Sequence, residues 1–431
     1  MSKRNWLLSG IAAFALSATA CDSTVGLDPT QPTFTKLLVP GVCPVSENLS
    51  QVGLSVMLLD GRSALVPDSR IARETGVLGE LLSIQNFSFD KAPQDEGTQI
   101  NDPAVVVSDD GTPDKQGITF APVGLDFAYP GSEARKNQNK LVVLVMDHSG
   151  SLSGLDPMTG RPDNTLRTDY RDERISFFDQ LVGGLPSDYF VSLVKMNDRG
   201  GNITQCTPAE ACGMPERVCS NPTKNRDPVK CGLRSLQFNE QGLTPMNETL
   251  KRAMESIIRP NADPSRTNDP LNPVVVVFSD GTEERDPSGD LFADDGAGPL
   301  YAQGINGQPV PIIFVHLGAP RTSRFYEEPS GRSQQFQRLA CETGGEYVFL
   351  EDAAEFLDNS DLQSVVSNRI EGVWRLLSDT SLSYEQFESG GYLMSTSVTV
   401  SLGGKQRTRA LQRTVESSGA GEDSRVWMVK P

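Results

Sequence analysis

The sequence predicts an α/β protein: a doubly wound, mostly parallel sheet with helices on both faces, flanked by β-rich N- and C-terminal segments. Between residues 139 and 377, continuous apolar runs of strand length alternate with stretches of helical period. That alternation is typical of a parallel sheet covered by helices. On either side, short runs alternate apolar and polar residues, which indicates strands with one solvated face. A length of 431 residues agrees with more than one domain.

The first twenty residues have the pattern of an export signal. Lys3 and Arg4 precede an apolar stretch, and residues 18–20 form a small-residue cleavage region. Cleavage by an ordinary signal peptidase would release a soluble protein. Cys21 follows directly, however, and this arrangement resembles the lipobox of bacterial lipoproteins, whose cysteine is acylated. The chain has seven cysteines, so lipidation of Cys21 would leave six that can pair. This parity favours the lipid anchor.

A tether and a small β-rich domain are expected next. Residues 22–38 are rich in Pro, Thr and Asp and show no periodicity, so together with Cys21 they would link the anchor to the rest of the chain. Residues 39–135 indicate a β-rich domain. Its clearest strand patterns are Leu54–Leu59, before the turn dipeptide Asp60-Gly61, and the alternating segment 118–127.

The central domain, 139–377, is expected to alternate strands and helices. Buried strands are predicted at the apolar runs 141–146, 190–194, 274–278 and 312–315. Helices are predicted at the apolar stripes that start at Ile175 and Met246, the second reaching Ile258, and over 332–343 and 353–377. The last of these would end in the apolar cluster Val373, Trp374, Leu376 and Leu377.

The C-terminal segment 379–431 is expected to be β-rich. Residues 395–402 alternate apolar and polar side chains. These strands could complete the N-terminal β domain, because chain termini often lie close together.

The cysteines indicate disulfides in an oxidising compartment outside the cytoplasm. Four of them crowd a 26-residue stretch: Cys206, Cys212, Cys219 and Cys231. Zinc sites usually have paired cysteines two to four residues apart, whereas these are separated by five, six and eleven residues. Disulfides are therefore favoured over zinc, with three pairings open. Cys43 and Cys341 remain, and they could pair with each other.

Composition excludes several classes of function. Lys and Arg number 39 against 56 Asp and Glu, a net charge of −17. Such a surface repels phosphate backbones, so nucleic acid is not expected as a partner. The two histidines, His148 and His316, exclude a zinc centre of several histidines. No segment after the export signal approaches the roughly twenty apolar residues of a membrane span.

Oxygen-bearing side chains follow two of the predicted strands. Asp147, Ser149 and Ser151 come directly after the run 141–146, and Asp280 comes after the run 274–278. Because the carboxyl ends of parallel strands meet at one edge of a sheet, these residues are expected at the edge where open α/β sheets bind ligands.

The pattern Asp-x-Ser-x-Ser at 147–151 resembles the start of the metal-ion-dependent adhesion site of the von Willebrand factor A family. In that comparison Thr244, in Gly-Leu-Thr-Pro, stands at the place of the family's metal-binding threonine, and Asp280 at that of its second aspartate. The stretch 339–345, with the strand 346–350 after it, resembles the end of such a domain. The resemblance covers residues 139–377 and implies a Rossmann-like fold. It also implies a divalent cation held by Asp147, Ser149, Ser151, Thr244 and Asp280.

The chemistry of these side chains suits Mg²⁺, which prefers six hard oxygen ligands, although Mn²⁺ or Ca²⁺ could take the same place. The resemblance implies one coordination position open to a Glu or Asp carboxylate of a partner. Nothing in the motif resembles a metal-activated nucleophile with a base beside it, so binding is expected rather than catalysis. His148 is not part of any Ser–His–Asp or Cys–His pattern, and His316 has the place of a core or strand-end residue.

Each part of the motif also has a simpler explanation. Ser149-Gly150-Ser151 could be a plain turn, Thr244 could cap the helix that follows Pro245, and Asp280-Gly281 is a common turn dipeptide. Their joint occurrence at one predicted sheet edge favours the metal site.

Two segments, 198–235 and 282–309, depart from the family pattern as insertions, and we expect both to crown the metal edge. The acidic segment 282–309 is expected to be a solvated loop rather than a second calcium site. The sequence thus predicts a membrane-tethered, metal-dependent protein-binding or adhesion module of the bacterial cell envelope. The alternative is an envelope assembly module that docks without a metal switch, and an enzyme is the least expected class.

Overall fold

A computed structural model of the chain describes residues 34–38, 42–44, 51–60, 82–91, 126–127, 139–149, 170–196, 222–235, 244–280, 291–317, 332–350, 366–367, 370, 374–379, 392–402, 405–417 and 427–430. The predicted export signal, Cys21, most of the tether, Ser151, and three of the clustered cysteines (Cys206, Cys212 and Cys219) lie outside these residues.

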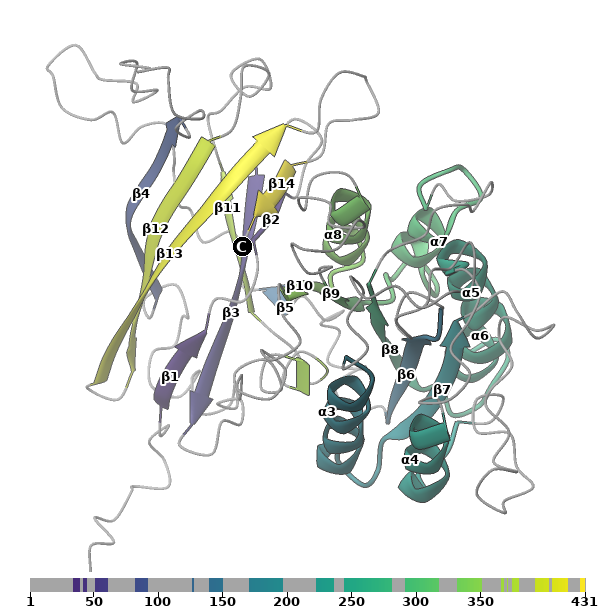
Figure 1. Cartoon of the computed structure of the whole chain (residues 1–431). Helices are drawn as coiled ribbons and strands as arrows, with labels where there is room; N and C mark the ends of the chain where they lie inside the picture. Colours follow the sequence, from purple (N-terminus) through teal and green to yellow (C-terminus); the bar gives the residue numbers. More distant parts are fainter. Residues whose placement is uncertain are drawn as a thin grey trace, which may run out of the picture.

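A five-stranded parallel sheet forms the centre of the α/β part of the chain (Figure 1). Its strands are β6 (Lys140–Asp147), β7 (Phe190–Met196), β8 (Asn272–Ser279), β9 (Ile312–Leu317) and β10 (Glu346–Leu350). The spatial order is β10-β9-β8-β6-β7, with every neighbouring pair parallel. All four predicted buried strands and the predicted strand at 346–350 are confirmed.

Burial explains why these runs are continuously apolar. Every residue of β6 and of β8 is buried, so both faces of each strand are covered. The chain moves from β6 outward to β7 and then returns to the other side of β6 to form β8. In open parallel sheets, ligands bind at the carboxyl ends of the strands where the order reverses in this way. In this sheet that point lies between β6 and β8.

The helices pack on the sheet through alternate residues of its strands. One hydrophobic cluster joins α3 (Tyr170–Gly184) and α4 (Arg226–Ser235) to one face of the sheet. Its members include Phe178 of α3, Leu233 of α4, and Val142 and Leu144 of β6. A second cluster joins α5 (Met246–Ala253), α7 (Ala297–Gln303) and α8 (Arg332–Glu342) to the alternate strand residues on the other face of the sheet. It includes Leu250, Tyr301 and Leu339 of the helices and Val143 and Val275 of the strands.

The helix predicted at 246–258 is confirmed and is longer than expected. It continues from α5 through a π-helical turn, η5 (Met254–Ile258), into α6 (Arg259–Ala262). The helices predicted from the stripe at Ile175 and over 332–343 are confirmed as α3 and α8.

The described part of the segment 282–309 differs from the predicted surface loop. Leu291, Ala297, Tyr301 and Ile305 are buried in the second cluster. Tyr301 donates a hydrogen bond of 3.0 Å to the carbonyl of Leu250 on α5. Residues 291–309 therefore form an ordinary helical connection between β8 and β9. The sequence does not predict this helix, because α7 contains Gly298 and Pro299, which have low helix propensity.

The segment 198–235 also differs from the prediction in its described part, which begins at residue 222. Thr223 bridges to Val191 through two backbone hydrogen bonds of 2.9 and 3.1 Å. Val191 is the second residue of β7, so this part of the segment joins the sheet at the amino end of β7. Thr223 therefore lies at the opposite end of β7 from Met196, which is aligned with Asp147.

Two antiparallel sheets contain strands from both ends of the chain (Figure 1). The first comprises β1 (Phe34–Leu38), β2 (Val42–Pro44), β3 (Gln51–Asp60), β5 (Asp126–Phe127) and β11 (Trp374–Asp379). The second comprises β4 (Leu82–Lys91), β12 (Tyr392–Leu402), β13 (Lys405–Ser417) and β14 (Trp427–Lys430). The strands expected around 54–59 and 395–402 are confirmed as β3 and β12.

The N- and C-terminal segments therefore pair with each other, since β11 pairs with β3 and β12 pairs with β4. The predicted helix 353–377 is wrong at its end, because Trp374, Leu376 and Leu377 belong to β11. Within the part of the chain that the structure describes, no helix has the length and apolar character of a bilayer span.

Candidate metal centre

Asp147 ends β6 and lies at the reversal point of the sheet. Its side chain is fully buried. The backbone N–H of Ser149 donates to Oδ1 at 2.8 Å, and the hydroxyl of Ser279 donates to Oδ2 at 2.5 Å. Ser279 is the last residue of β8, so its hydroxyl bonds to a carboxylate on the neighbouring strand, 132 positions away in the chain. These two bonds fix the orientation of the Asp147 carboxylate.

A second carboxylate lies close to the first. Burial, followed by the negative charge of Asp280, raises the pKa of Asp147 to about 7. Asp280 follows β8 directly and is partly exposed. Two neighbouring carboxylates, one of them desolvated, repel each other when both are ionised. A bound cation would relieve this repulsion.

Ser149 lies in the segment that continues from β6, and its side chain is buried. The segment is held toward β7, because the backbone N–H of His148 donates to the carbonyl of Met196 at 2.9 Å. The structure thus brings Asp147, Ser149 and Asp280 together at one edge.

Thr244 does not act as the helix cap that its sequence position suggested. The N-cap residue of α5 is Pro245, and no side chain caps the helix there. The Thr244 side chain is buried, and its Oγ1 has no hydrogen-bond partner among the residues that the structure describes. Burying a hydroxyl without a partner costs free energy of desolvation. Helix capping does not account for the burial of this hydroxyl, so a different role has to account for it.

The helix that follows Thr244 places that residue toward the edge of the sheet that carries Asp147 and Asp280. The helical segment from Met246 to Ala262 rises roughly 25 Å and β8 spans roughly 26 Å. The far end of this segment is tied to the amino end of β8, where Leu271 N–H donates to the Asn261 carbonyl at 2.8 Å. The start of α5 therefore lies toward the carboxyl end of β8, which carries Asp280.

Two contacts of this edge were not predicted from the sequence. The first is the bond from Ser279 to Asp147, although Ser279 stands directly before Asp280 in the sequence. The second involves His316 on β9, whose ring lies 2.8 Å from the Tyr347 hydroxyl through Nδ1 and 3.3 Å from the Asp280 carbonyl through Nε2. Burial lowers the pKa of His316 to about 4, so the ring is neutral at physiological pH. As predicted, His316 is a buried strand residue.

The donor chemistry fits a hard divalent cation. Among the described residues, no three His, Cys, Asp or Glu side chains gather in a way that could hold a metal. The edge instead combines hydroxyl oxygens with two carboxylates, which suits Mg²⁺ and does not suit a soft-ligand zinc centre.

Two cysteines of the parallel-sheet part of the chain do not belong to this edge. Cys231 on α4 and Cys341 on α8 are both disulfide-bonded. Their helices pack on opposite faces of the parallel sheet, so they are not each other's partner.

No protein-family model matches the chain, and no curated protein matches it. A search of solved structures finds the PilB minor pilin from Streptococcus sanguinis, with 15% sequence identity and a TM-score of 0.32. The match covers 54% of this chain and 62% of the pilin, so it spans less than two thirds of the pilin's length. A likeness at this score supports no conclusion about fold or function.

Proposed function

We propose that residues 139 to about 373 form a doubly wound domain of the von Willebrand factor A type, with a divalent-cation site at its carboxyl edge. The domain binds a protein or surface ligand that offers a Glu or Asp carboxylate. It belongs to a protein of the bacterial cell envelope that is anchored in a membrane by lipid on Cys21. The cation is Mg²⁺, with Mn²⁺ or Ca²⁺ as substitutes.

One observation carries the proposal. The Thr244 hydroxyl is buried, has no hydrogen-bond partner within the described part of the chain and does not cap α5. It lies toward the edge at which the Asp147 and Asp280 carboxylates repel each other. A cation accounts for both features, because it accepts a lone pair from the hydroxyl and neutralises the two negative charges.

The residues of the proposed site would contribute two kinds of oxygen ligand, neutral and charged. Ser149, Ser151 and Thr244 offer neutral oxygens, and Asp147 and Asp280 supply the negative charge, directly or through water. When bound, the cation supplies a positive centre that attracts an external carboxylate. Ser279 and the Ser149 amide hold the Asp147 carboxylate in one orientation. That orientation reduces the ordering that binding would otherwise require.

The first test is Mg²⁺ binding by the full chain, measured by calorimetry after EDTA treatment and dialysis. We expect one site in the wild type and loss of binding in Asp147→Ala. Asp179→Ala is the matched control, since it removes an aspartate of α3 that forms ion pairs with α4. A wild-type protein that takes up no Mg²⁺, Mn²⁺ or Ca²⁺ contradicts the proposal.

The second test is a pull-down from envelope extract with wild type and Asp147→Ala, each with Mg²⁺ and with EDTA. Metal-dependent binding predicts a partner that only the wild type with Mg²⁺ retains. A partner retained equally in all four samples would instead support an assembly module that docks without a metal switch.

A further inference from the structure

We infer that His316 and Tyr347 are positioning residues for the proposed cation site, which they serve by holding the backbone of Asp280. The inference rests on the proposed function, because it assigns two new residues to the same site. Neither residue is itself expected to bind the cation.

The three residues come from three neighbouring strands. Tyr347 lies on β10, His316 on β9, and Asp280 directly after β8, and the spatial order of these strands is β10-β9-β8. In the register, His316 is aligned with Ser279, the last residue of β8. The His316 ring therefore bridges from the outermost strand of the sheet to the first residue of the loop after β8.

The direction of the two hydrogen bonds follows from their chemistry. A backbone carbonyl only accepts, so the contact of 3.3 Å with the Asp280 oxygen requires a proton on Nε2 of His316. In a neutral ring Nδ1 then accepts, and the Tyr347 hydroxyl donates to it at 2.8 Å. The chain of donors runs from Tyr347 through His316 to Asp280.

Packing holds the ring in this orientation. Phe336 of α8 meets it edge-on, with ring centroids 5.2 Å apart, and Phe314 does so at 6.1 Å. Only 7% of His316 is exposed. The apolar surroundings favour the neutral ring, and the Tyr347 hydroxyl selects the tautomer that can donate to Asp280.

The consequence concerns the second carboxylate of the site. Asp280 is partly exposed directly after β8, and its carbonyl accepts a hydrogen bond from the buried His316 side chain. Groups that orient a metal ligand without touching the metal typically change its affinity by 10–100-fold. The 3.3 Å bond is long, so we expect an effect near the lower end of that range.

The test compares Mg²⁺ dissociation constants measured by calorimetry on the full chain. His316→Phe keeps an aromatic ring but cannot donate, and we expect its affinity to fall about tenfold. Tyr347→Phe removes only the hydroxyl and should weaken binding less. His316→Gln can still donate from its amide to Asp280, so its affinity should lie closer to that of the wild type.

The matched control is Tyr301→Phe, which removes a buried tyrosine hydroxyl that donates to Leu250 on another helix. Thermal unfolding in EDTA reports the structural cost of each variant separately from metal affinity. Wild-type affinity in both His316→Phe and Tyr347→Phe would overturn the inference while leaving the proposed function intact. A wild-type protein that binds none of Mg²⁺, Mn²⁺ and Ca²⁺ would overturn both.

Discussion

The Thr244 hydroxyl gives the sharpest prediction at the scale of single residues. It is one of two buried hydroxyls, with Ser192 Oγ, that lack a hydrogen-bond partner in the described part of the chain. Thr244→Val should leave the stability of the metal-free protein unchanged or slightly raised, because it removes a desolvated group that bonds to nothing. It should also abolish the rise in melting temperature on adding Mg²⁺.

Ser192→Ala is the control for this change. It removes the other unpartnered hydroxyl, which lies on β7, and it should retain the full response to Mg²⁺. Thermal unfolding with excess Mg²⁺ and with EDTA measures both variants. A Thr244→Val protein that is still stabilised by Mg²⁺ as strongly as the wild type would remove Thr244 from the site.

The Asp147 carboxyl should make the metal-free protein less stable as the pH rises. Its folded-state pKa is about 7, whereas its ordinary value is 3.8, so between these values the folded state holds a proton that the unfolded state has lost. The protonated Asp147 carboxyl therefore makes its full favourable contribution to the free energy of unfolding below about pH 4, and this contribution disappears as the pH passes 7. Its size is on the order of a few kcal/mol.

Urea unfolding in EDTA at several pH values measures this effect. The difference between wild type and Asp147→Asn isolates the one carboxyl group from all others that titrate. We expect Asp147→Asn to gain stability over the wild type as the pH rises toward 8. A difference that does not vary with pH would show that Asp147 is not the group responsible.

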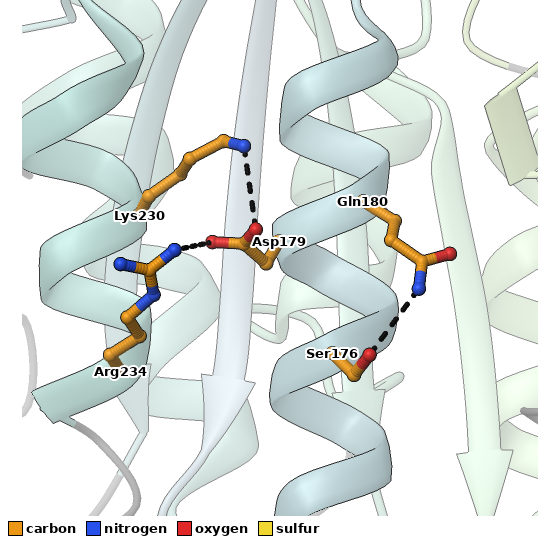
Figure 2. Close-up of polar contacts among 5 residues, drawn as sticks. All are labelled: Ser176, Asp179, Gln180, Lys230 and Arg234. Atoms are coloured by element: carbon orange, nitrogen blue, oxygen red, sulfur yellow. Dashed lines mark hydrogen bonds and ion pairs between the residues drawn. The ribbon is translucent and has the colours of Figure 1, made fainter.

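At the scale of secondary-structure elements, an ion-pair cluster joins α3 to α4. Asp179 of α3 lies 3.4 Å from Lys230 Nζ and 3.1 Å from Arg234 Nη2, both on α4 (Figure 2). The Lys230 side chain also reaches across to Gly183 of α3, where an added Cβ would lie 2.9 Å from Lys230 Nζ. The Asp179 side chain is 25% exposed, so water screens the pairs in part.

Asp179→Ala should lower the free energy of unfolding by about 1 kcal/mol, since it leaves two cations of α4 without their acceptor. Gln180→Ala is the control, because Gln180 bonds only at 3.3 Å to Ser176 on another side of the same helix (Figure 2). Its effect should be below about 0.5 kcal/mol. Equal losses in the two variants, measured by urea unfolding, would show that helix propensity and not the ion pairs is responsible.

The predictability of an element depends on how locally it is determined. The strands β6 and β8 are recognisable because each is buried on both faces and therefore apolar throughout. The strand β11 is not, because its apolar residues also fit a helix. Its structure is set by pairing with β3, more than 300 residues earlier in the chain. The helix α7 contains Gly298 and Pro299, so its propensity is poor and only its packing against α5 explains it.

The same distinction applies to the candidate site. Asp147, Ser149 and Asp280 could be placed at one edge because each directly follows a recognisable buried strand. Ser279 and His316 could not, since their contacts depend on the register and order of strands far apart in the sequence. The unpartnered state of the Thr244 hydroxyl depends on packing around α5, which no local pattern encodes.

At the scale of the whole molecule, helix α8 of the parallel-sheet unit lies against β2 of the first antiparallel sheet (Figure 1). Cys341, in the last turn of α8, is buried and disulfide-bonded, and Cys43 is the central residue of β2. Cys231 is disulfide-bonded on the opposite face. We therefore expect Cys43 and Cys341 to pair with each other.

Peptide mapping of the unreduced protein by mass spectrometry checks this expectation. A peptide containing Cys43 should be linked to one containing Cys341, and reduction should release both. The bond forms when two thiols give up two protons and two electrons by exchange with a protein disulfide donor. A Cys341 peptide linked instead to Cys206, Cys212 or Cys219 would contradict the pairing.

The pairing of β5 with β11 bears on how this chain could be rebuilt. Phe127 is aligned with Trp374 and Asp126 with Arg375, so the whole parallel-sheet unit departs from and returns to adjacent positions of one antiparallel sheet. The backbone thus enters and leaves the parallel-sheet unit at one place in the first antiparallel sheet, and α8 adds a separate contact with β2. Exchanging the parallel-sheet unit for another compact domain with closely spaced ends should leave the hydrogen-bond register of the first antiparallel sheet unchanged. The sheet could then carry a different inserted domain.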